Sequence, residues 1–452
     1  MKLRNIFAVA LAGLAFTACN NDDVPGKGTD GNGAEKTFIG LTIQLPKGTV
    51  TKGATDGAGT AEENRLKTLH IYCWTGMNIG TPTTVDIKTE ATSDGAGGYT
   101  VNAAIEGVVG ANNIFVTANT AAPITGLTAA GVTHDTPQEL TQTLASLIDE
   151  AGTGEGFVMF SKDIVVVNAA AAAKADVEAG SVATNIAAVT LRRAVAKVAL
   201  TSSLTATDGT GIDDEGGFCT IYDVKWNIAN QPTTLYPVVK FAAGTNFEAG
   251  NIISPYTTFD PNLDPTEAVP ALNEAAALQY CKENAHGSAN DYTNKNTTTI
   301  QVMAICSPKT YYKEVTDAGS GKFTATTANN LAKGTTFYTL KAADGELAAN
   351  SFFDETAAGQ YATIKGGDKA TYFNEYKDGK CYWTIYIHNG ATPKVYGVLR
   401  NNLYTVNINS IKAPGFPALP IDNTPIASEA WIQTTIAVEP WTANAMGDVD
   451  LQ

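Results

Sequence analysis

The chain has 452 residues and a formal net charge of −15. Its length suits about two or three domains that each bury a core. The negative charge repels phosphate backbones and anionic lipid surfaces, which disfavours nucleic-acid binding and electrostatic adhesion to membranes. No segment after the N-terminus is apolar enough to cross a bilayer. The composition therefore agrees with an exported, soluble body.

The N-terminus predicts a lipoprotein signal peptide over residues 1–18. Lys2 and Arg4 form a cationic start, the apolar stretch Ile6 to Phe16 follows, and two small residues precede Cys19. About ten apolar residues are too few to span a hydrocarbon core of ~30 Å as a permanent helix. Processing would leave Cys19 as a new N-terminus that carries acyl chains. An ordinary secretory signal that happens to contain a cysteine is the alternative.

Residues 19–35 predict a flexible tether. A polar run, Asn20 to Asp23, is followed by a Gly-rich run that reaches Gly33. Such a segment cannot bury enough apolar surface to offset the entropy of ordering it.

Strand signals dominate the rest of the chain. In Phe38 to Leu45, the side chains of Ile39, Leu41, Ile43 and Leu45 share one face by the period of two, which predicts a half-buried strand. Eight further β-rich runs are separated by polar turn-forming clusters: Leu69 to Trp74, Asn113 to Ala118, Phe157 to Val167, Arg193 to Leu200, Ile221 to Ile228, Thr299 to Cys306, Cys381 to His388 and Tyr404 to Ile411. Many short strands with long polar loops predict an all-β fold built of sandwiches.

One helix is predicted from Thr136 to Gly152. Thr136 offers an N-cap, Pro137 the first helical position and Glu139 the third, and apolar residues then recur at helical spacing from Leu140 onward. The Ala-rich run Asn168 to Gly180 and the segment Pro270 to Tyr280 could each hold a short helix.

The sequence shows no catalytic or metal-binding pattern. Five cysteines remain after Cys19, with no CxxC spacing, and Cys73, Cys306 and Cys381 lie in strand-like runs where a buried thiol is expected. The four histidines form no HExxH, HxH or i, i+4 pair. We therefore expect no disulfide framework, no metal, no cofactor and no enzymatic activity. A carboxylate pair for glycoside hydrolysis stays open, because separation in space decides that chemistry.

Several short segments together resemble the major fimbrial subunits (fimbrillins) of Bacteroidetes, especially the short-fimbria type. They are the lipobox at Cys19, the strand Phe38 to Leu45 with the Lys-Gly loop behind it, the stretch Thr190 to Val198, the run Arg400 to Ile408, and the tail Ile432 to Gln452 with Trp441. The resemblance follows the whole chain in order.

The resemblance implies two transthyretin-like β-sandwich domains with minor helices, which we place at 36–200 and 201–452. It also implies delivery to the outer membrane as a lipoprotein, removal of the N-terminal piece by a trypsin-like protease, and polymerisation by strand exchange. The expected partners are further copies of the chain, anchor and tip subunits, the protease, and host or bacterial surface receptors.

Strand exchange requires an acceptor groove and a donor. If strand 38–45 lies at one edge of a sandwich and leaves after cleavage, it uncovers an apolar groove flanked by unpaired backbone groups. The tail 427–452 is the predicted donor, because Ile432, Thr434, Ile436 and Val438 alternate with other residues. Beyond Pro440, the apolar donor residues are Trp441, Met446, Val449 and Leu451. The alternative is that this tail is the last strand of its own sandwich.

The cut is predicted between Lys52 and Gly53. The family is usually cut after Arg in the loop behind the first strand, and Lys52 takes that place here. Arg65, at the edge of the next strand, is the alternative site.

The leading hypothesis is a structural shaft subunit of a surface fimbrium that supports adhesion, since a donor-like tail is not needed by a tip subunit. The alternative is a lipid-anchored surface module that binds glycan or another ligand, with Trp74, Trp226 and Trp383 as candidate stacking platforms.

Overall fold

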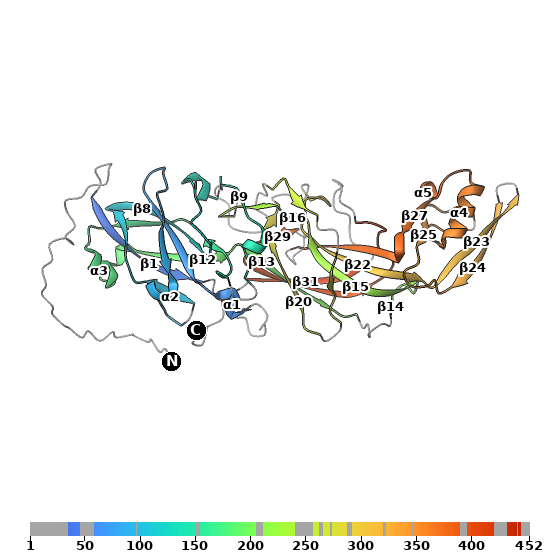
Figure 1. Ribbon diagram of the computed structural model, residues 1–452, viewed down its shortest axis with the longest axis horizontal. Coiled ribbons are helices and arrows are strands. Elements are labelled where there is room, and N and C mark those ends of the chain that lie inside the picture. Colours follow the sequence, from blue (N-terminus) through green and yellow to red (C-terminus); the bar gives the residue numbers. More distant parts are fainter. Residues whose placement is uncertain are drawn as a thin grey trace, which may run out of the picture.

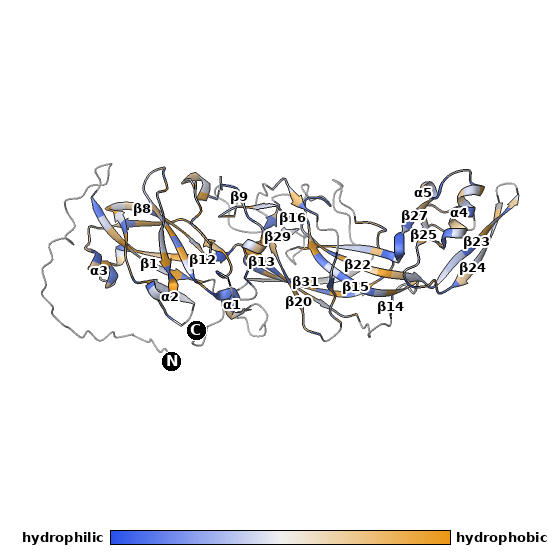
Figure 2. Cartoon of the chain, viewed as in Figure 1, coloured by the Kyte–Doolittle hydropathy of each residue, from blue (hydrophilic) through white to orange (hydrophobic). Residues whose placement is uncertain are grey.

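The computed structural model describes residues 35–45, 58–95, 97–134, 136–149, 154–204, 211–239, 256–261, 265–271, 274–286, 292–319, 322–345, 347–388, 396–419, 432–440 and 442–443. The described part is elongated, with β-sheets following one another along the long axis (Figure 1). Apolar residues concentrate on the strands of these sheets (Figure 2).

Ten strands form one sheet at the end of the molecule drawn in blue and green (Figure 1). They are β1 (Lys36–Gln44), β3 (Thr68–Trp74), β4 (Thr83–Asp86), β5 (Ala91–Ser93), β6 (Gly98–Val101), β7 (Ile105–Val108), β8 (Gly110–Ala118), β10 (Met159–Ser161), β11 (Val165–Ala169) and β12 (Ile186–Arg193). The order is β4-β3-β8-β10-β12-β1-β6-β5, with β11 on β8 and β7 on β1. Strands β1 and β8 each pair with three strands, and the sheet folds over one hydrophobic cluster, which we call the N-terminal cluster.

Two further sheets pack face to face in the middle of the molecule. One has the order β20-β13-β30-β31 and the other the order β14-β15-β22-β28, with β19 on β15. Their strands are β13 (Val195–Ser202), β14 (Ile212–Asp213), β15 (Cys219–Ala229), β19 (Glu267–Ala268), β20 (Ala277–Lys282), β22 (Thr299–Pro308), β28 (Lys380–Tyr386), β30 (Asn402–Ile411) and β31 (Ile432–Pro440). Val198, Trp226, Trp383 and Val406 from both sheets share a second cluster, which is the packing of a β-sandwich.

A fourth sheet lies at the opposite end from the ten-stranded sheet (Figure 1). Its order is β24-β23-β26-β25-β27. The strands are β23 (Thr310–Gly319), β24 (Lys322–Asn329), β25 (Phe337–Leu340), β26 (Phe352–Phe353) and β27 (Phe373–Tyr376), and the helices α4 (Glu355–Ile364) and α5 (Lys369–Tyr372) pack beside them. Phe353, Tyr361 and Phe373 are buried in its cluster. We call this unit the distal module.

Short elements connect these sheets. The helices are α1 (Ala61–Asn64), α2 (Ile87–Glu90) and α3 (Lys174–Glu178), with 3-10 turns η1 (Ala130–Val132), η2 (Leu144–Ser146), η3 (Ala183–Asn185) and η6 (Lys377–Gly379). Two-stranded pairs join β2 (Ala58–Gly59) to β32 (Thr442–Ala443), β9 (Leu140–Thr141) to β17 (Thr234–Leu235), β16 (Gln231–Pro232) to β18 (Phe259–Asp260), and β21 (Asn284–Ala285) to β29 (Gly397–Val398).

The all-β fold class is confirmed, and each predicted strand run contains a strand. The run Phe157 to Val167 holds two, β10 and β11. The division at residue 200 and the transthyretin-like topology stay predictions, and residue 200 itself falls inside β13.

The predicted helix over 136–152 is wrong. Residues 140–141 pair with β17, and a 3-10 turn, capped by the Thr143 hydroxyl, covers 144–146. Leu140 and Leu147 are buried in the N-terminal cluster, and Leu144 and Ile148 pack against it. The apolar residues thus meet the core without a helix, because tertiary packing overrides local propensity.

The two possible helices had different outcomes. The Ala-rich run contains α3, as expected. The segment Pro270 to Tyr280 instead runs into strand β20, which pairs with β13.

Candidate assembly site

The first strand, β1, lies inside its sheet and not at an edge. It runs parallel to β12 on one side and antiparallel to β6 and β7 on the other. The expectation of an edge strand is therefore wrong, because β6 and β7 cover the side that was expected to be open. Removing β1 would consequently leave two unpaired backbone edges that face each other.

The apolar face of β1 is buried as the alternation predicted. Ile39, Leu41, Ile43 and Leu45 are each at most 1% exposed and belong to the N-terminal cluster. The fit is tight, since a Cβ on Gly107 would lie 2.6 Å from Cδ1 of Ile39. Each such aliphatic side chain stabilises the sheet by roughly 1.5–3 kcal/mol through its burial.

Buried polar side chains hold the start of β1, and no local pattern in the sequence predicts them. The amide nitrogen of the fully buried Asn185 donates to the carbonyls of Phe38 and Ala170, both at 2.9 Å. The Thr37 hydroxyl donates to the Ala170 carbonyl at 2.7 Å and accepts from the Ala172 N–H at 3.1 Å. Loss of β1 would leave these buried groups without the partners that β1 supplies.

The predicted donor segment pairs with its own sandwich in this single chain. Strand β31 (Ile432–Pro440) runs antiparallel to β30 as the last strand of its described sheet, and Ile436 is half-buried against the second cluster. Further on, Thr442 and Ala443 run parallel to Ala58 and Gly59. The donor residues Trp441, Met446, Val449 and Leu451 lie outside the described residues.

Two of the motifs that carry the resemblance, Thr190 to Val198 and Arg400 to Ile408, meet at a buried junction. Strand β13 pairs in parallel with β30, and the Asn401 N–H donates to the Val195 carbonyl at 2.8 Å. The Nη1 atom of the fully buried Arg193 donates to Oδ1 of Asn401 at 3.2 Å. Arg400 forms a buried ion pair, with its Nε 3.1 Å from Oε2 of Glu283.

Helix α1 is anchored in this junction by Glu63. Its Oε1 lies 2.8 Å from Nζ of Lys197 and accepts from the Tyr280 hydroxyl at 2.5 Å. The backbone carbonyl of Glu63 accepts from Nε of Arg193 at 2.9 Å, and Asn64 Oδ1 accepts from another nitrogen of the same guanidinium. We call Glu63, Asn64, Arg193, Lys197 and Tyr280 the α1 latch.

The pKa values of Glu63 and Arg193 depend on their burial and on their hydrogen-bond and charge partners. Burial raises the pKa of Glu63, but the hydrogen bonds from Lys197 and Tyr280 outweigh it, so the pKa of Glu63 lies below its usual value. Burial lowers the pKa of Arg193 to about 10, and Glu63 counteracts this. Glu63 and Arg193 are therefore both ionised at neutral pH.

The latch could have been found in part from sequence. Thr60-x-x-Glu63 has the spacing of a capping box, and the structure forms one: the Glu63 N–H donates to the Thr60 hydroxyl, and the Thr60 N–H to Oε2 of Glu63. The pairing of Glu63 with Lys197 and Tyr280 joins residues far apart in the chain, and no local signal predicts it.

Of the two predicted cut sites, only Arg65 lies among the described residues. Lys52 and Gly53 lie outside the described residues, as does Cys19. Arg65 directly follows α1 between the buried Asn64 and Leu66, and its carbonyl accepts from the Asn119 side chain at 2.8 Å. The Arg65 peptide is thus tied to the fold by its carbonyl and flanked by two buried residues, which disfavours cleavage there.

Other candidate residues are buried. Trp74, Trp226 and Trp383 are at most 5% exposed in the two large clusters, so they offer no surface for stacking on a glycan. Cys73 is half-buried, and the other four described cysteines are buried free thiols. No group of three metal-ligating side chains lies together among the described residues, nor does that part hold a helix long and apolar enough to span a membrane.

Residues 374–446 match the family model "Major fimbrial subunit protein type IV, Fimbrillin, C-terminal". This match confirms the predicted resemblance to the fimbrillins. It covers strands β27 to β32, including the Arg400 motif and the start of the tail. The match supports a role as a fimbrial subunit.

Solved structures of similar proteins span most of the chain. A candidate cell adhesion protein from Bacteroides eggerthii is 15% identical with a TM-score of 0.44, covering 94% of this chain and 99% of its own. A fimbrillin from Porphyromonas gingivalis is 15% identical with a TM-score of 0.42, covering 90% and 99%. A tip fimbrial protein from the same species is 12% identical with a TM-score of 0.38, covering 90% and 100%. The comparison with curated proteins found no match.

Proposed function

We propose that this chain is a non-enzymatic shaft subunit of a cell-surface fimbrium, which is matured by proteolysis and polymerises by donor-strand exchange. The observation that carries the proposal is the position of β1, buried in the core and paired on both sides. The fimbrillin match in the C-terminal part supports the same role.

The acceptor is the groove that β1 occupies in the precursor. Its departure would uncover an apolar floor between β12 and the pair β6 and β7, with backbone N–H and C=O groups unpaired on both walls. Four aliphatic side chains at roughly 1.5–3 kcal/mol each, together with about 1 kcal/mol for each net backbone bond, give a donor a durable joint. A donor that pairs on both sides is held more firmly than one added at a single edge.

The donor is the tail, 427–452, of another copy. Among the described strands β31 pairs with β30 alone, at the end of its sheet, so it can separate without opening the middle of the sandwich. Since the groove and the tail are different surfaces, the contact is heterologous and propagates as a filament.

The latch favours Lys52 over Arg65 as the cut. A cut between Lys52 and Gly53 removes β1 and keeps α1. A cut after Arg65 would detach Glu63 and Asn64, which removes a carboxylate from Lys197 and two acceptors from the buried Arg193. Removing one partner of a buried ion pair typically costs about 3–5 kcal/mol.

Before cleavage, acyl chains on Cys19 would anchor the precursor in the outer membrane, and the tether 19–35 would hold the body away from the lipid. The partners are further copies of the chain, anchor and tip subunits, a trypsin-like maturation protease that accepts lysine, and receptors on host or bacterial surfaces. A permanently lipidated glycan-binding module is the second candidate, and the burial of the three tryptophans weakens its original basis.

N-terminal sequencing of the protein sheared from cells tests the proposal. A mature chain that begins at Gly53 and assembles is expected. An assembled chain that begins at Leu66 would move the cut to Arg65. An acylated Cys19 on a chain that never assembles would favour the permanently anchored module and refute the shaft role.

A further inference from the structure

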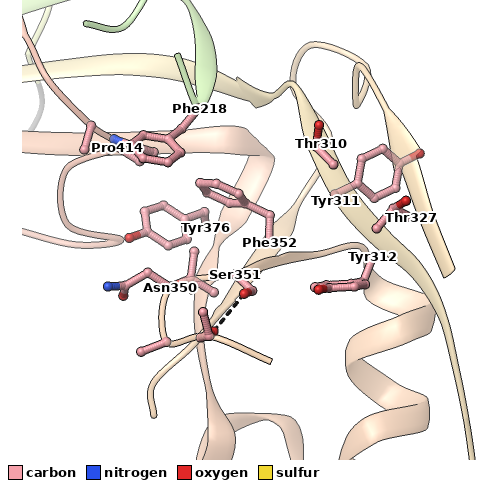
Figure 3. Close-up of a pocket in the computed structure, with 14 residues that line it drawn as sticks. Phe218, Thr310, Tyr311, Tyr312, Thr327, Asn350, Ser351, Phe352, Tyr376 and Pro414 are labelled. Atoms are coloured by element: carbon pink, nitrogen blue, oxygen red, sulfur yellow. Dashed lines mark hydrogen bonds between the residues drawn. The ribbon is translucent and has the colours of Figure 1, made fainter. Parts of the chain in front are cut away.

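A cavity of about 500 Å³ lies where the distal module meets the sandwich. Strands β23 and β24 and the segment 348–352 form its distal side, and Phe218 and Pro414 come from the sandwich side. In the close-up, Phe218, Pro414 and Tyr376 lie to one side of Phe352, and Tyr311 and Tyr312 lie to the other (Figure 3).

The aromatic rings around the cavity are held from behind. Phe337, in the second cluster, stacks on Tyr376 with ring centroids 4.5 Å apart and meets Phe352 edge-on at 5.7 Å. Tyr312 packs on the buried Phe353 at 4.9 Å. Tyr376 also donates its hydroxyl to the Gly415 carbonyl at 2.9 Å, which fixes the wall at Pro414. A ligand would therefore meet the rings of Tyr312, Phe352 and Tyr376 in fixed positions, and binding would not have to order them.

Neutral hydrogen-bonding groups line the cavity beside the aromatic rings. Thr310 and Thr327 are exposed on β23 and β24, and the exposed Asn350 offers a side-chain amide. The Ser351 hydroxyl donates to the Ala348 carbonyl at 2.7 Å, so its oxygen can still accept (Figure 3). None of the 14 lining residues drawn in Figure 3 is charged, although charged residues make up 17% of the chain.

We propose that this cavity is a binding site for a neutral saccharide. Sugar rings have one apolar face that stacks on an aromatic side chain and a rim of hydroxyls that needs neutral donors and acceptors, and the cavity supplies both. An anionic ligand would meet no lining cation and a chain of net charge −15. A purely aliphatic ligand would cover the hydroxyls and the amide without satisfying them.

The site is independent of strand exchange. Its residues lie at the junction of the sandwich and the distal module, away from the ten-stranded sheet that holds β1 (Figure 1), so the uncleaved precursor already contains the cavity. Binding by uncleaved monomer would give the subunit an adhesive function of its own, and its absence would leave the assembly proposal untouched.

Calorimetric titration of the full-length, uncleaved chain tests the site. The probes are maltotriose, mannotriose, cellotriose, galactobiose and N,N′-diacetylchitobiose, with sialyllactose as the anionic comparison. At least one neutral probe should bind. Phe218→Ser and Tyr311→Ser should each weaken it about tenfold, which corresponds to about 1.4 kcal/mol for a lost stacked ring.

Two further variants sharpen the test. Asn350→Gly removes the amide and keeps the left-handed backbone (φ 66°), so it should weaken binding without strain. Phe416→Ser is the matched control, because Phe416 is also an exposed aromatic, at 42%, but does not line the cavity. Circular dichroism melting confirms that each variant is folded.

The proposal is overturned if no neutral probe binds, if sialyllactose alone binds, or if folded cavity variants bind as well as Phe416→Ser does. It is also overturned if the cavity variants lose filament formation and bind every saccharide normally, since the cavity would then be a contact between copies.

Discussion

The α1 latch makes a sharp prediction about stability. Replacing Glu63 by Gln preserves the size of the side chain but removes the charge that the buried Lys197 contacts at 2.8 Å and that lies beside the buried Arg193. Breaking a buried pair in this way typically costs about 3–5 kcal/mol of unfolding free energy. That loss is a large part of the ~5–15 kcal/mol by which folded proteins are stable.

The same variant should lose a pH dependence. The pKa of Glu63 is lowered in the folded chain, so the latch contributes its full stability above the ordinary glutamate pKa of about 4.3 and loses it as the pH falls through the lower, folded pKa. Glu63→Gln cannot titrate there. The difference in stability between the parent and the variant should therefore be constant near neutral pH and shrink in acid.

Urea unfolding of the uncleaved chain, followed by tryptophan fluorescence from pH 3 to pH 8, measures both effects. Glu62→Gln is the matched control, because Glu62 is the neighbouring carboxylate and is only half-buried. The assignment of the latch would be refuted if Glu63→Gln had the same urea midpoint as Glu62→Gln. It would also be refuted if the difference in unfolding free energy between the parent and Glu63→Gln widened in acid.

Three further predictions concern maturation and assembly. Cys19→Ala should abolish incorporation of a labelled fatty acid, because no neighbouring residue has a thiol to acylate, and undiminished labelling would remove the lipoprotein premise. Lys52→Gln should be secreted as a folded monomer with β1 in place, and filaments whose subunits begin at Leu66 would show that Arg65 is cut. Deleting residues 441–452 should weaken trypsin-induced assembly by on the order of 5 kcal/mol, roughly three to four decades, with little change in melting temperature; a truncated chain that still forms filaments would contradict the donor role.

Alternation along the chain was sufficient to predict the strands, because one buried face imposes a period of two whatever the partner strand is. The run Phe38 to Leu45 shows this well: its four aliphatic residues are buried as predicted. Its place inside the sheet was not predictable, because pairing with β6 and β7 depends on short strands whose own signals are weak.

Helix signals were less reliable. Thr136 to Gly152 has a cap, a proline and apolar spacing, yet β9 and a 3-10 turn replace the helix. Helix α1 has four residues and was missed, although its capping box is visible in the sequence. Its retention depends on Lys197 and Tyr280, which only the folded chain brings to Glu63.

The aromatic cavity was equally hidden. Phe218, Tyr311 and Phe352 come from separate parts of the chain, and no spacing relates them. Trp74, Trp226 and Trp383 were the candidate stacking platforms, but the core buries these large apolar side chains.

The contacts of β1 and α1 differ in kind, and this difference defines what can be exchanged. Most of what holds β1 is generic, namely backbone pairing and aliphatic burial, so another strand with alternating apolar residues can replace it. Helix α1 is held by charges at fixed positions, which an extended donor cannot reproduce. The boundary between the replaceable and the permanent part of the chain therefore falls between Leu45 and Thr60, and Lys52 lies inside that interval while Arg65 lies beyond it.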